Sequence, residues 1–405
     1  MNIVADLHIH SKYSRATSNL MDLENLSRFA KIKGIDVLGT GDFTHPLWFK
    51  ELKHKLSGDG IYEYDGMKFI LSAEISLMYT QNGRGRRVHN IILAPDFGIA
   101  GQVNEWLGKK GRLDYDGRPI FNFNCIELVD AMMNISKDIE IIPAHAFTPW
   151  FSLFGSMSGF DSIDECFGDR VNKIHAIETG LSSNPAMNWR LSQLDRFSIV
   201  SFSDSHSPYP WRLGREATVF DVEKISCKEI INAIRNKKIV YTIEFFPEEG
   251  KYHYDGHRAC GVCMSPKEAL KNKNICPKCR RMLTIGVLHR VEELADRPDG
   301  YKPEGAAPFK SLIPLSEIIA AVTGSGTGTQ KVWGIYNRLI QKCGSEFKVL
   351  LEAEKSEIKA VSDETMAETI IANREGKIKI EPGYDGVYGK PVLQNKQKTI
   401  GEFMR

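Results

Sequence analysis

The chain has 405 residues, of which 42% are hydrophobic and 26% are charged. This length and balance exclude a disordered or fibrous chain and predict two or three globular domains. The 53 basic and 51 acidic residues nearly cancel, so the net charge of +2 says little about partners. The longest apolar runs are broken well short of the roughly 20 residues that a membrane span needs, so no membrane partner is expected.

The start of the chain and its cysteines bear on the cellular compartment. Residues 1–6 contain no basic stretch followed by an apolar segment and a cleavage site, so we expect no secretory signal and a cytoplasmic location. Four of the eight cysteines form two CxxC pairs. In a reducing compartment, this pattern favours a metal site over disulfides.

Residues 1–245 alternate short apolar runs with amphipathic stretches, which is typical of a parallel sheet with helical crossovers. A helix is expected over residues 23–32, ended by Gly34, and another after Ser226, where Glu229 completes a capping box. Seven strands are predicted, over residues 2–7, 36–40, 68–73, 88–94, 140–143, 173–177 and 198–202.

The composition changes at Phe246, where prolines, glycines and tyrosines predict loops. We expect a second module over residues 246–297, which holds the cysteine pairs. A mainly helical third domain is expected over residues 298–405, with helices over residues 313–322 and 332–340.

Ligand-type residues follow the predicted strands. His8 and His10 form a His-x-His pair after the first strand, and residues two apart on an extended chain point to the same side. Alone the pair is a weak signal, because such pairs also arise by chance. The other strands are followed by Asp42, His45, Glu74, His89, His145, Asp204 and His206.

In a parallel α/β barrel, the carboxyl ends of the strands meet at one mouth, where active sites are built. The recurrence of ligand residues after the strands therefore favours a barrel over an open sheet. Histidines and carboxylates in this ratio suit two or three Zn²⁺ or Mn²⁺ ions bridged by a carboxylate such as Glu74, with Mg²⁺ as a further candidate in the reaction. The competing interpretation is a set of ordinary polar residues on the barrel rim.

These motifs, His8-x-His10, Gly41-Asp42, Glu74, His89, His145 and Ser203-Asp204-Ser205-His206, resemble the metal motifs of the PHP phosphoesterase superfamily. The resemblance implies a distorted (β/α)7 barrel with a trinuclear metal centre that hydrolyses phosphate esters. Many members have Asp-His in the second motif, where this chain has Asp42-Phe43. The ligand from this motif, Asp42 or His45, therefore stays open.

The resemblance also implies roles for single residues. The first ion would be held by His8, His10, Glu74 and Asp204, the second by Glu74, His89 and His145, and the third by His206 with Asp42 or His45. The implied catalytic residues are His8, His10, Glu74, His145, Asp204 and His206.

Cys260, Cys263, Cys276 and Cys279 predict a structural zinc site. Each CxxC turn places two thiolates on one ion, and a hairpin brings the pairs together into a tetrahedral four-cysteine site. Between Lys251 and Arg290 lie nine Lys or Arg and two acidic residues, a net charge of +7. This charge indicates a polyanionic partner, while a solvated surface without a ligand is the alternative.

The order of PHP barrel, zinc ribbon and helical tail resembles the endonuclease Q family of the same superfamily, over essentially the full chain. This resemblance implies a metal-dependent DNA repair endonuclease. Its substrates would be DNA with deaminated bases, such as deoxyuridine and deoxyinosine, or with abasic sites, cut on the 5′ side of the lesion. Damaged DNA is then the expected partner, and a sliding clamp is a candidate for delivering the enzyme.

Two kinds of side chain are candidates for DNA contact. Basic residues in a flexible glycine-rich loop and in the ribbon can reach phosphates, namely Arg84, Arg86, Arg87, Lys271, Lys273, Arg280 and Arg281. Trp150 and Trp211 are candidates to stack on a flipped base, with packing at the barrel rim as the alternative. Two other functions stay open: a small-molecule phosphatase of the histidinol-phosphatase type, and a nucleic-acid-binding scaffold with an inactive barrel.

Overall fold

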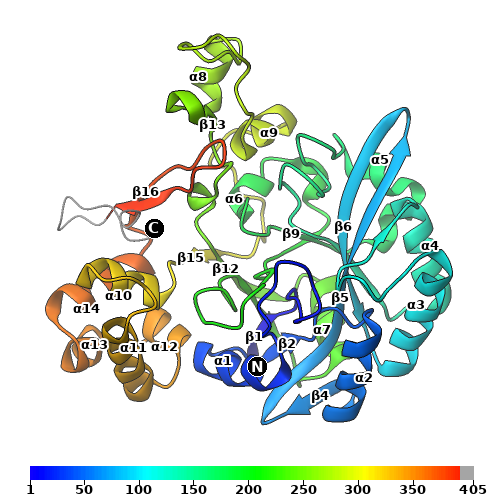
Figure 1. Cartoon of the computed structure of the whole chain (residues 1–405), viewed down its shortest axis with the longest axis horizontal. Helices are drawn as coiled ribbons and strands as arrows, with labels where there is room; N and C mark the ends of the chain where they lie inside the picture. The colour runs from blue at the N-terminus through cyan, green and yellow to red at the C-terminus, as the bar shows by residue number, and fades with distance from the viewer. Residues whose placement is uncertain (393–405) are drawn as a thin grey trace.

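The N-terminal part of the chain forms an α/β barrel, from which a small ribbon projects on one side and a group of helices on another (Figure 1). The computed structural model describes residues 1–392. Within this range, no helix is long and apolar enough to cross a membrane. The α/β class of the barrel and the helical C-terminal part agree with the prediction from sequence.

The barrel sheet is mixed, whereas the sequence pattern predicts a parallel one. Strands β1 (Asn2–Asp6), β2 (Val37–Gly39) and β5 (Met67–Gln81) run parallel. Strand β6 (Arg84–Ala94) is antiparallel both to β5 and to β8 (Glu140–Pro143). On the other side, β1 pairs antiparallel with β11 (Ala217–Asp221), which pairs antiparallel with β12 (Ile239–Glu244).

The direction of β6 follows from a two-residue turn. Gln81 pairs with Arg84, and the two residues between them, Asn82 and Gly83, have φ angles of 52° and 72°. Asn-Gly with two positive φ angles is the preferred connection of a tight hairpin. The expectation of a flexible basic loop over residues 83–87 is therefore wrong, since these residues belong to a turn and a strand (Figure 1).

The remaining barrel strands, β9 (Ala176–Glu178) and β10 (Ser198–Val200), pair in parallel. They join the sheet at both edges, because the Ala146 amide donates to the Glu178 carbonyl (2.9 Å) and the Ser201 amide donates to Thr218 Oγ1 (2.9 Å). Each of the seven predicted strands overlaps a strand of the structure, although the one expected over residues 173–177 begins only at Ala176. The short strands β3 (Ser57–Asp59), β4 (Ile61–Tyr64) and β7 (Ile120–Phe121) extend the sheet beside β5.

Two barrel helices end or begin where the sequence predicts. Helix α1 (Leu23–Lys33) ends at Gly34, whose φ of 96° lies in the left-handed region. Helix α7 (Cys227–Arg235) begins after Ser226, whose side chain accepts a hydrogen bond from the Glu229 amide (3.2 Å). The other barrel helices are α2 (Pro46–Lys55), α3 (Phe97–Lys110), α4 (Cys125–Ile135), α5 (Ile163–Phe167) and α6 (Pro185–Asn188).

The ribbon is a hairpin followed by two helices. Its strands β13 (Asp255–His257) and β14 (Val262–Met264) pair antiparallel, and the helices are α8 (Pro266–Lys271) and α9 (Val287–Leu294). A small apolar cluster of Val262, Ala269, Cys276 and Leu283 lies inside it.

The C-terminal part of the chain contacts both the barrel and the ribbon. Strand β15 (Phe309–Ser311) adds to the barrel sheet beside β12, and the hairpin of β16 (Lys379–Glu381) and β17 (Lys390–Val392) contacts the ribbon. In that contact, Thr284 Oγ1 of the ribbon donates to Asp385 (2.7 Å). The helices between are α10 (Leu315–Thr323), α11 (Gln330–Cys343), α12 (Glu346–Leu351), α13 (Lys355–Val361) and α14 (Glu364–Arg374).

A buried ion pair attaches these helices to the barrel. Lys33 of α1 lies 2.8 Å from Glu346 of α12 and also donates to the Pro210 carbonyl (2.7 Å). Tyr336 donates to the second oxygen of Glu346 (2.7 Å). Removing one partner would leave a buried charge unpaired, which costs about 3–5 kcal/mol, so the pair fixes α12 against α1.

Glu317 lies in α10 near this ion pair, and burial raises its pKa from 4.5 to about 7. An acid with a raised pKa in the folded state destabilises the fold as pH rises from its unfolded value to its folded value. We therefore expect Glu317→Gln to stabilise the chain at about pH 8 by up to about 3 kcal/mol, with a much smaller effect at about pH 5. Scanning calorimetry at both pH values measures this difference. An equal change in stability at both pH values would contradict a raised pKa of Glu317 in the folded chain.

Candidate metal centre

The side chains expected to bind metal gather at one end of the barrel. Two groups of side chains are assembled there, and within each group the potential ligand atoms lie within 4.8 Å of one another. The first group is His8, His10, Glu74 and Asp204, and the second is Glu74, His89 and His145. Glu74 belongs to both groups. These are the two sets that the PHP resemblance implies for the first and second ions, and their role as ligands remains a prediction.

The first group has the properties of a cation site. His8 Nε2, His10 Nε2 and Asp204 Oδ1 are buried but make no hydrogen bond. Asp204 Oδ1 nevertheless lies 3.5 Å from His8 Nε2 and 3.0 Å from His10 Nε2. Leaving a buried polar atom unsatisfied costs about 1–3 kcal/mol, so lone pairs that converge in this way fit a bound cation. Imidazole and carboxylate donors suit Zn²⁺ and Mn²⁺.

The two oxygens of Glu74 face the two groups. Oε2 lies 3.2 Å from His10 Nε2 in the first group. Oε1 lies 2.7 Å from His89 Nδ1 and 3.1 Å from His145 Nε2 in the second. This is the arrangement of a carboxylate that bridges two ions, and the chain therefore has groups suited to divalent metal ions.

Neighbouring groups of the centre shift one another's pKa values. Burial by itself would raise the pKa of Glu74, but His89, Arg118 and His8 lower it well below its usual value. Burial would lower the pKa of His8, but Glu178, Asp204 and Glu74 raise it well above 6.5. For His89, burial dominates and lowers the pKa to about 4. The carboxylates of the centre are thus ionised and available as ligands.

Glu178 is a candidate functional residue that the sequence analysis missed. It is fully buried, accepts a hydrogen bond from His8 Nδ1 (2.9 Å) and accepts another from the His145 amide (2.7 Å). Holding Nδ1 directs His8 Nε2 toward the other ligands, as carboxylates behind metal-binding histidines do. The sequence does contain one signal for Glu178, which is its position at the end of β9. The expected ligands also stand at the ends of strands, so an acidic residue there is a candidate for the same site.

Arg118 is a second missed residue, and it lies in the loop before β7. Its Nη1 lies 3.1 Å from Glu74 Oε2, and 27% of its side chain is exposed. A cation beside the bridging carboxylate and open to solvent can contact an anionic substrate. No motif pointed to it, because its approach to Glu74 depends on the fold.

The third ligand set is not assembled among residues 1–392. Asp42 accepts hydrogen bonds from His10 Nδ1 (3.0 Å) and Ser14 Oγ (2.9 Å), so it orients a ligand as Glu178 does. The ring of His45 stacks on Tyr13 at a centroid distance of 4.4 Å. The ring of His206 lies 4.5 Å from that of His10 in the first group. Two of the three expected ligand sets are therefore assembled among the described residues, and the set expected for a third ion is not.

Sharp turns direct several of these side chains. Asp42, His145 and Asp204 have φ angles of 47°, 32° and 45°. Such conformations cost about 1–3 kcal/mol in residues other than glycine and cluster at functional sites. At Gly180, a Cβ would lie 2.3 Å from His145 Cβ, so only glycine allows this approach.

The arginines before His89 differ in their surroundings. Arg84 and Arg87 are exposed on β6, but Arg86 is only 6% exposed. The Arg86 guanidinium lies 4.1 Å from the centroid of the Phe160 ring and donates to the Gly159 carbonyl. Arg86 therefore packs inside the protein, which argues against the DNA contact expected of it, whereas Arg84 and Arg87 remain exposed candidates.

The two tryptophans contact other aromatic rings. Trp211 stacks on Tyr209 at 4.5 Å with an interplanar angle of 6°, and lies 5.5 Å from Trp333 of α11. Trp150 lies edge-on to Tyr252 at 5.3 Å. Both are half-buried. Base stacking by either ring stays a prediction, and the packing of Trp211 across to α11 favours a structural role for it.

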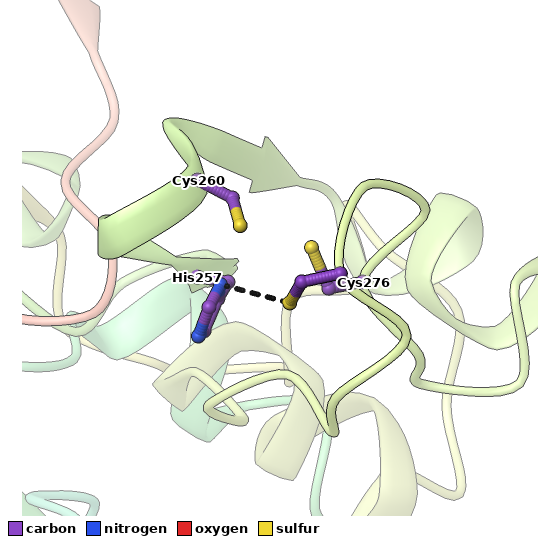
Figure 2. Close-up of side chains that lie close together, drawn as sticks. His257, Cys260 and Cys276 are labelled. Atoms are coloured by element: carbon purple, nitrogen blue, oxygen red, sulfur yellow. Dashed lines mark hydrogen bonds between the residues drawn. The ribbon is translucent and has the colours of Figure 1, made fainter.

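The ribbon differs from the predicted four-cysteine site in one ligand. Cys260, Cys276 and Cys279 lie together with His257, whereas Cys263 lies outside this group. Figure 2 shows His257, Cys260 and Cys276 of the group. The ribbon residues expected to contact DNA, Lys271, Lys273, Arg280 and Arg281, are all exposed.

Two solved structures of endonuclease Q resemble this chain over nearly its full length. The structure resembles the lesion-specific endonuclease PfuEndoQ from Pyrococcus furiosus with a TM-score of 0.89 and 35% identity, over 98% of this chain and 96% of that one. It also resembles endonuclease Q in complex with a 27-mer duplex substrate with an abasic lesion at the active site, with a TM-score of 0.87 and 34% identity, over 99% of this chain and all of that one.

Two further matches involve an archaeal protein. Residues 314–377 match the family model described as the MJ0043 C-terminal domain. The uncharacterised protein MJ0043 of Methanocaldococcus jannaschii is 35% identical over 285 residues, which is 69% of this chain and 34% of that protein. The chain therefore matches about a third of the length of this relative.

We expect Glu178→Gln to weaken metal binding by about 10–100-fold, because the neutral amide lacks the negative charge that holds both His8 Nδ1 and the His145 amide. Titration of the metal-free chain with Mn²⁺, followed by calorimetry, measures this affinity. Glu140→Gln is the matched control, since Glu140 is also fully buried and lies 2.8 Å from a histidine, His175, that belongs to neither ligand group. Unchanged Mn²⁺ affinity in Glu178→Gln would refute the positioning role.

Proposed function

This chain belongs to the endonuclease Q family, and we propose that it is a metal-dependent DNA repair endonuclease that cuts 5′ of deaminated bases and abasic sites. The observation that carries the proposal is the pair of ligand groups joined by Glu74 at the barrel mouth. An abasic lesion lies at the active site of the related endonuclease Q complex, which supports this lesion as one substrate. Deoxyuridine and deoxyinosine are proposed from the family resemblance.

The proposed centre would hold its ions through His8, His10, Glu74 and Asp204 on one side and Glu74, His89 and His145 on the other. Divalent ions, which we propose to be Zn²⁺ or Mn²⁺, would offset the charge of the phosphate and lower the pKa of water. Arg118 is placed to neutralise a phosphate oxygen at the open side of Glu74. The ring of His206 is partly exposed beside Asp204, and we propose it as a group that would contact the substrate at the open side of the centre.

The ribbon supports a polyanionic substrate. Its cationic side chains are exposed and lie on a module separate from the metal centre (Figure 1). A small phosphate monoester needs no such second surface, so this argues against the histidinol-phosphatase alternative. An inactive scaffold would have no chemical reason to keep two complete ligand groups. We further propose a cytoplasmic location, and delivery by a sliding clamp remains a prediction without an assigned surface.

We expect His8→Ala or Asp204→Ala to slow cleavage by at least about 100-fold while DNA binding persists, because each removes a ligand from the first group. The assay uses end-labelled duplexes that contain uracil, hypoxanthine, an abasic site or no lesion. His175→Ala, a histidine outside both groups, is the control and should cut normally.

Other outcomes of this assay identify the alternatives. Hydrolysis of small phosphate monoesters with all four duplexes left intact would identify a phosphatase. Binding without cutting by the unsubstituted, metal-loaded chain would identify a scaffold. Near-normal cutting by either ligand variant would overturn the assignment of the first group.

A separate prediction concerns the ribbon surface. Each phosphate contact releases condensed counterions, so log K falls with log salt by roughly 0.9 per contact. Changing Lys271, Lys273, Arg280 and Arg281 to glutamine should flatten this slope by about two to four, with lesion preference retained. The control is Lys224→Gln with Lys228→Gln, two exposed cations outside the ribbon, one before α7 and one in its first turn. An unchanged slope in the quadruple variant would place the backbone contacts elsewhere.

A further inference from the structure

We propose that the ribbon binds its metal ion through His257, Cys260, Cys276 and Cys279, and that Cys263 is not a ligand. The spacing of the cysteines predicts a site of four thiolates, so the proposal changes both the donor set and the state of one thiol. It concerns the ribbon alone and does not depend on the reaction at the barrel mouth.

The distances among the four side chains suit a tetrahedral ion. One ligand atom from each lies within 4.8 Å of the others. His257 Nδ1 lies 3.5 Å from Cys279 Sγ. With Zn–N of about 2.0–2.1 Å and Zn–S of about 2.3 Å, tetrahedral geometry separates the two donors by about 3.5–3.6 Å. Figure 2 shows the imidazole of His257 and the thiols of Cys260 and Cys276 turned toward a common space.

Strand alternation explains why Cys263 is outside this group. In the β13–β14 hairpin, His257 pairs with Val262, and Gly256 pairs with Cys263. Paired residues share a face of the hairpin, whereas neighbours along a strand point to opposite faces. Val262 is buried against Cys276 in the ribbon core. His257 is therefore on the metal side, and Cys263 points away.

The turn between the strands gives the same result. Cys260 ends a short 3-10 turn, and Gly261 follows with a φ of 59° in the left-handed region. Strand β14 begins at the next residue, Val262. The backbone is thus already in an extended strand at Cys263. The segment from Cys260 to Cys263 therefore does not form the tight turn that would direct both thiols at one ion.

The exposure of the cysteines separates Cys263 from the rest. Cys263 is exposed, whereas Cys125, Cys166 and Cys227 are buried and Cys343 is half-buried. Cys279 is also exposed, but it contacts His257 within the group. Cys263 is therefore the exposed cysteine of residues 1–392 that lies outside the proposed ligand set.

Replacing a thiolate with a neutral imidazole changes the charge of the site. A zinc ion with three thiolates and one imidazole carries one negative charge fewer than a zinc ion with four thiolates. Lys278, Arg280 and Arg281 are exposed next to the ligands in the sequence. With three thiolates instead of four, the metal site cancels less of the positive charge of these three side chains.

The first test is Co²⁺ loading of the full chain, followed by absorption. Thiolate-to-Co²⁺ charge-transfer bands come from the ribbon alone, because neither ligand group of the barrel contains cysteine. We expect Cys263→Ser to leave the band intensity and Co²⁺ affinity unchanged. Cys276→Ser should lower the intensity by about a third, and His257→Ala should keep the band while weakening affinity by more than about tenfold. A loss of about a quarter of the intensity in both serine variants would establish the four-cysteine site instead.

The second test needs no substitution, so it stays valid if His257→Ala does not fold. The zinc-loaded chain is treated with iodoacetamide, and the modified cysteines are identified by peptide mass spectrometry. We expect Cys263 to react while Cys260, Cys276 and Cys279 are protected, and all four to react after chelation. Protection of Cys263 together with the other three would overturn the proposal.

Discussion

The candidate metal centre depends on one buried carboxylate, Glu74, whose two oxygens face two different groups of potential ligands. A buried carboxylate is expensive unless neighbouring groups stabilise its charge, and His89, Arg118 and His8 hold the pKa of Glu74 well below its usual value. The mixed sheet makes this possible, because the hairpin of β5 and β6 places His89 close to Glu74 on the adjacent strand. The barrel mouth is therefore organised around a strand that runs against its neighbours.

A second layer of acids holds the ligands in place. Glu178 and Asp42 accept from the Nδ1 atoms of His8 and His10, so that both Nε2 atoms point at Asp204. Fixing an imidazole in this way reduces the entropy lost when it binds an ion and sets which nitrogen is free. Asp42, one of the two candidates for the third site, thus also contacts a member of the first group.

The outer modules are attached to the barrel by specific polar contacts. The ion pair of Lys33 and Glu346 ties the C-terminal helices to α1, and the segment between β16 and β17 contacts the ribbon through Asp385. These contacts hold the cationic ribbon and the metal centre on one framework (Figure 1). Such a framework suits a substrate that is larger than either site.

The sequence by itself determined what local periodicity controls: the seven strands, the helix ended by Gly34, and the ligand residues after the strands. The Asn82-Gly83 turn was also readable and would have predicted the antiparallel β6. Only the tertiary structure decided the contacts of Glu178 with His8, of Arg118 with Glu74 and of His257 with the cysteines, and the burial of Arg86. Each of these depends on contacts between residues far apart in the chain or on which face of a strand packs inward, and neither is encoded in the spacing of a motif.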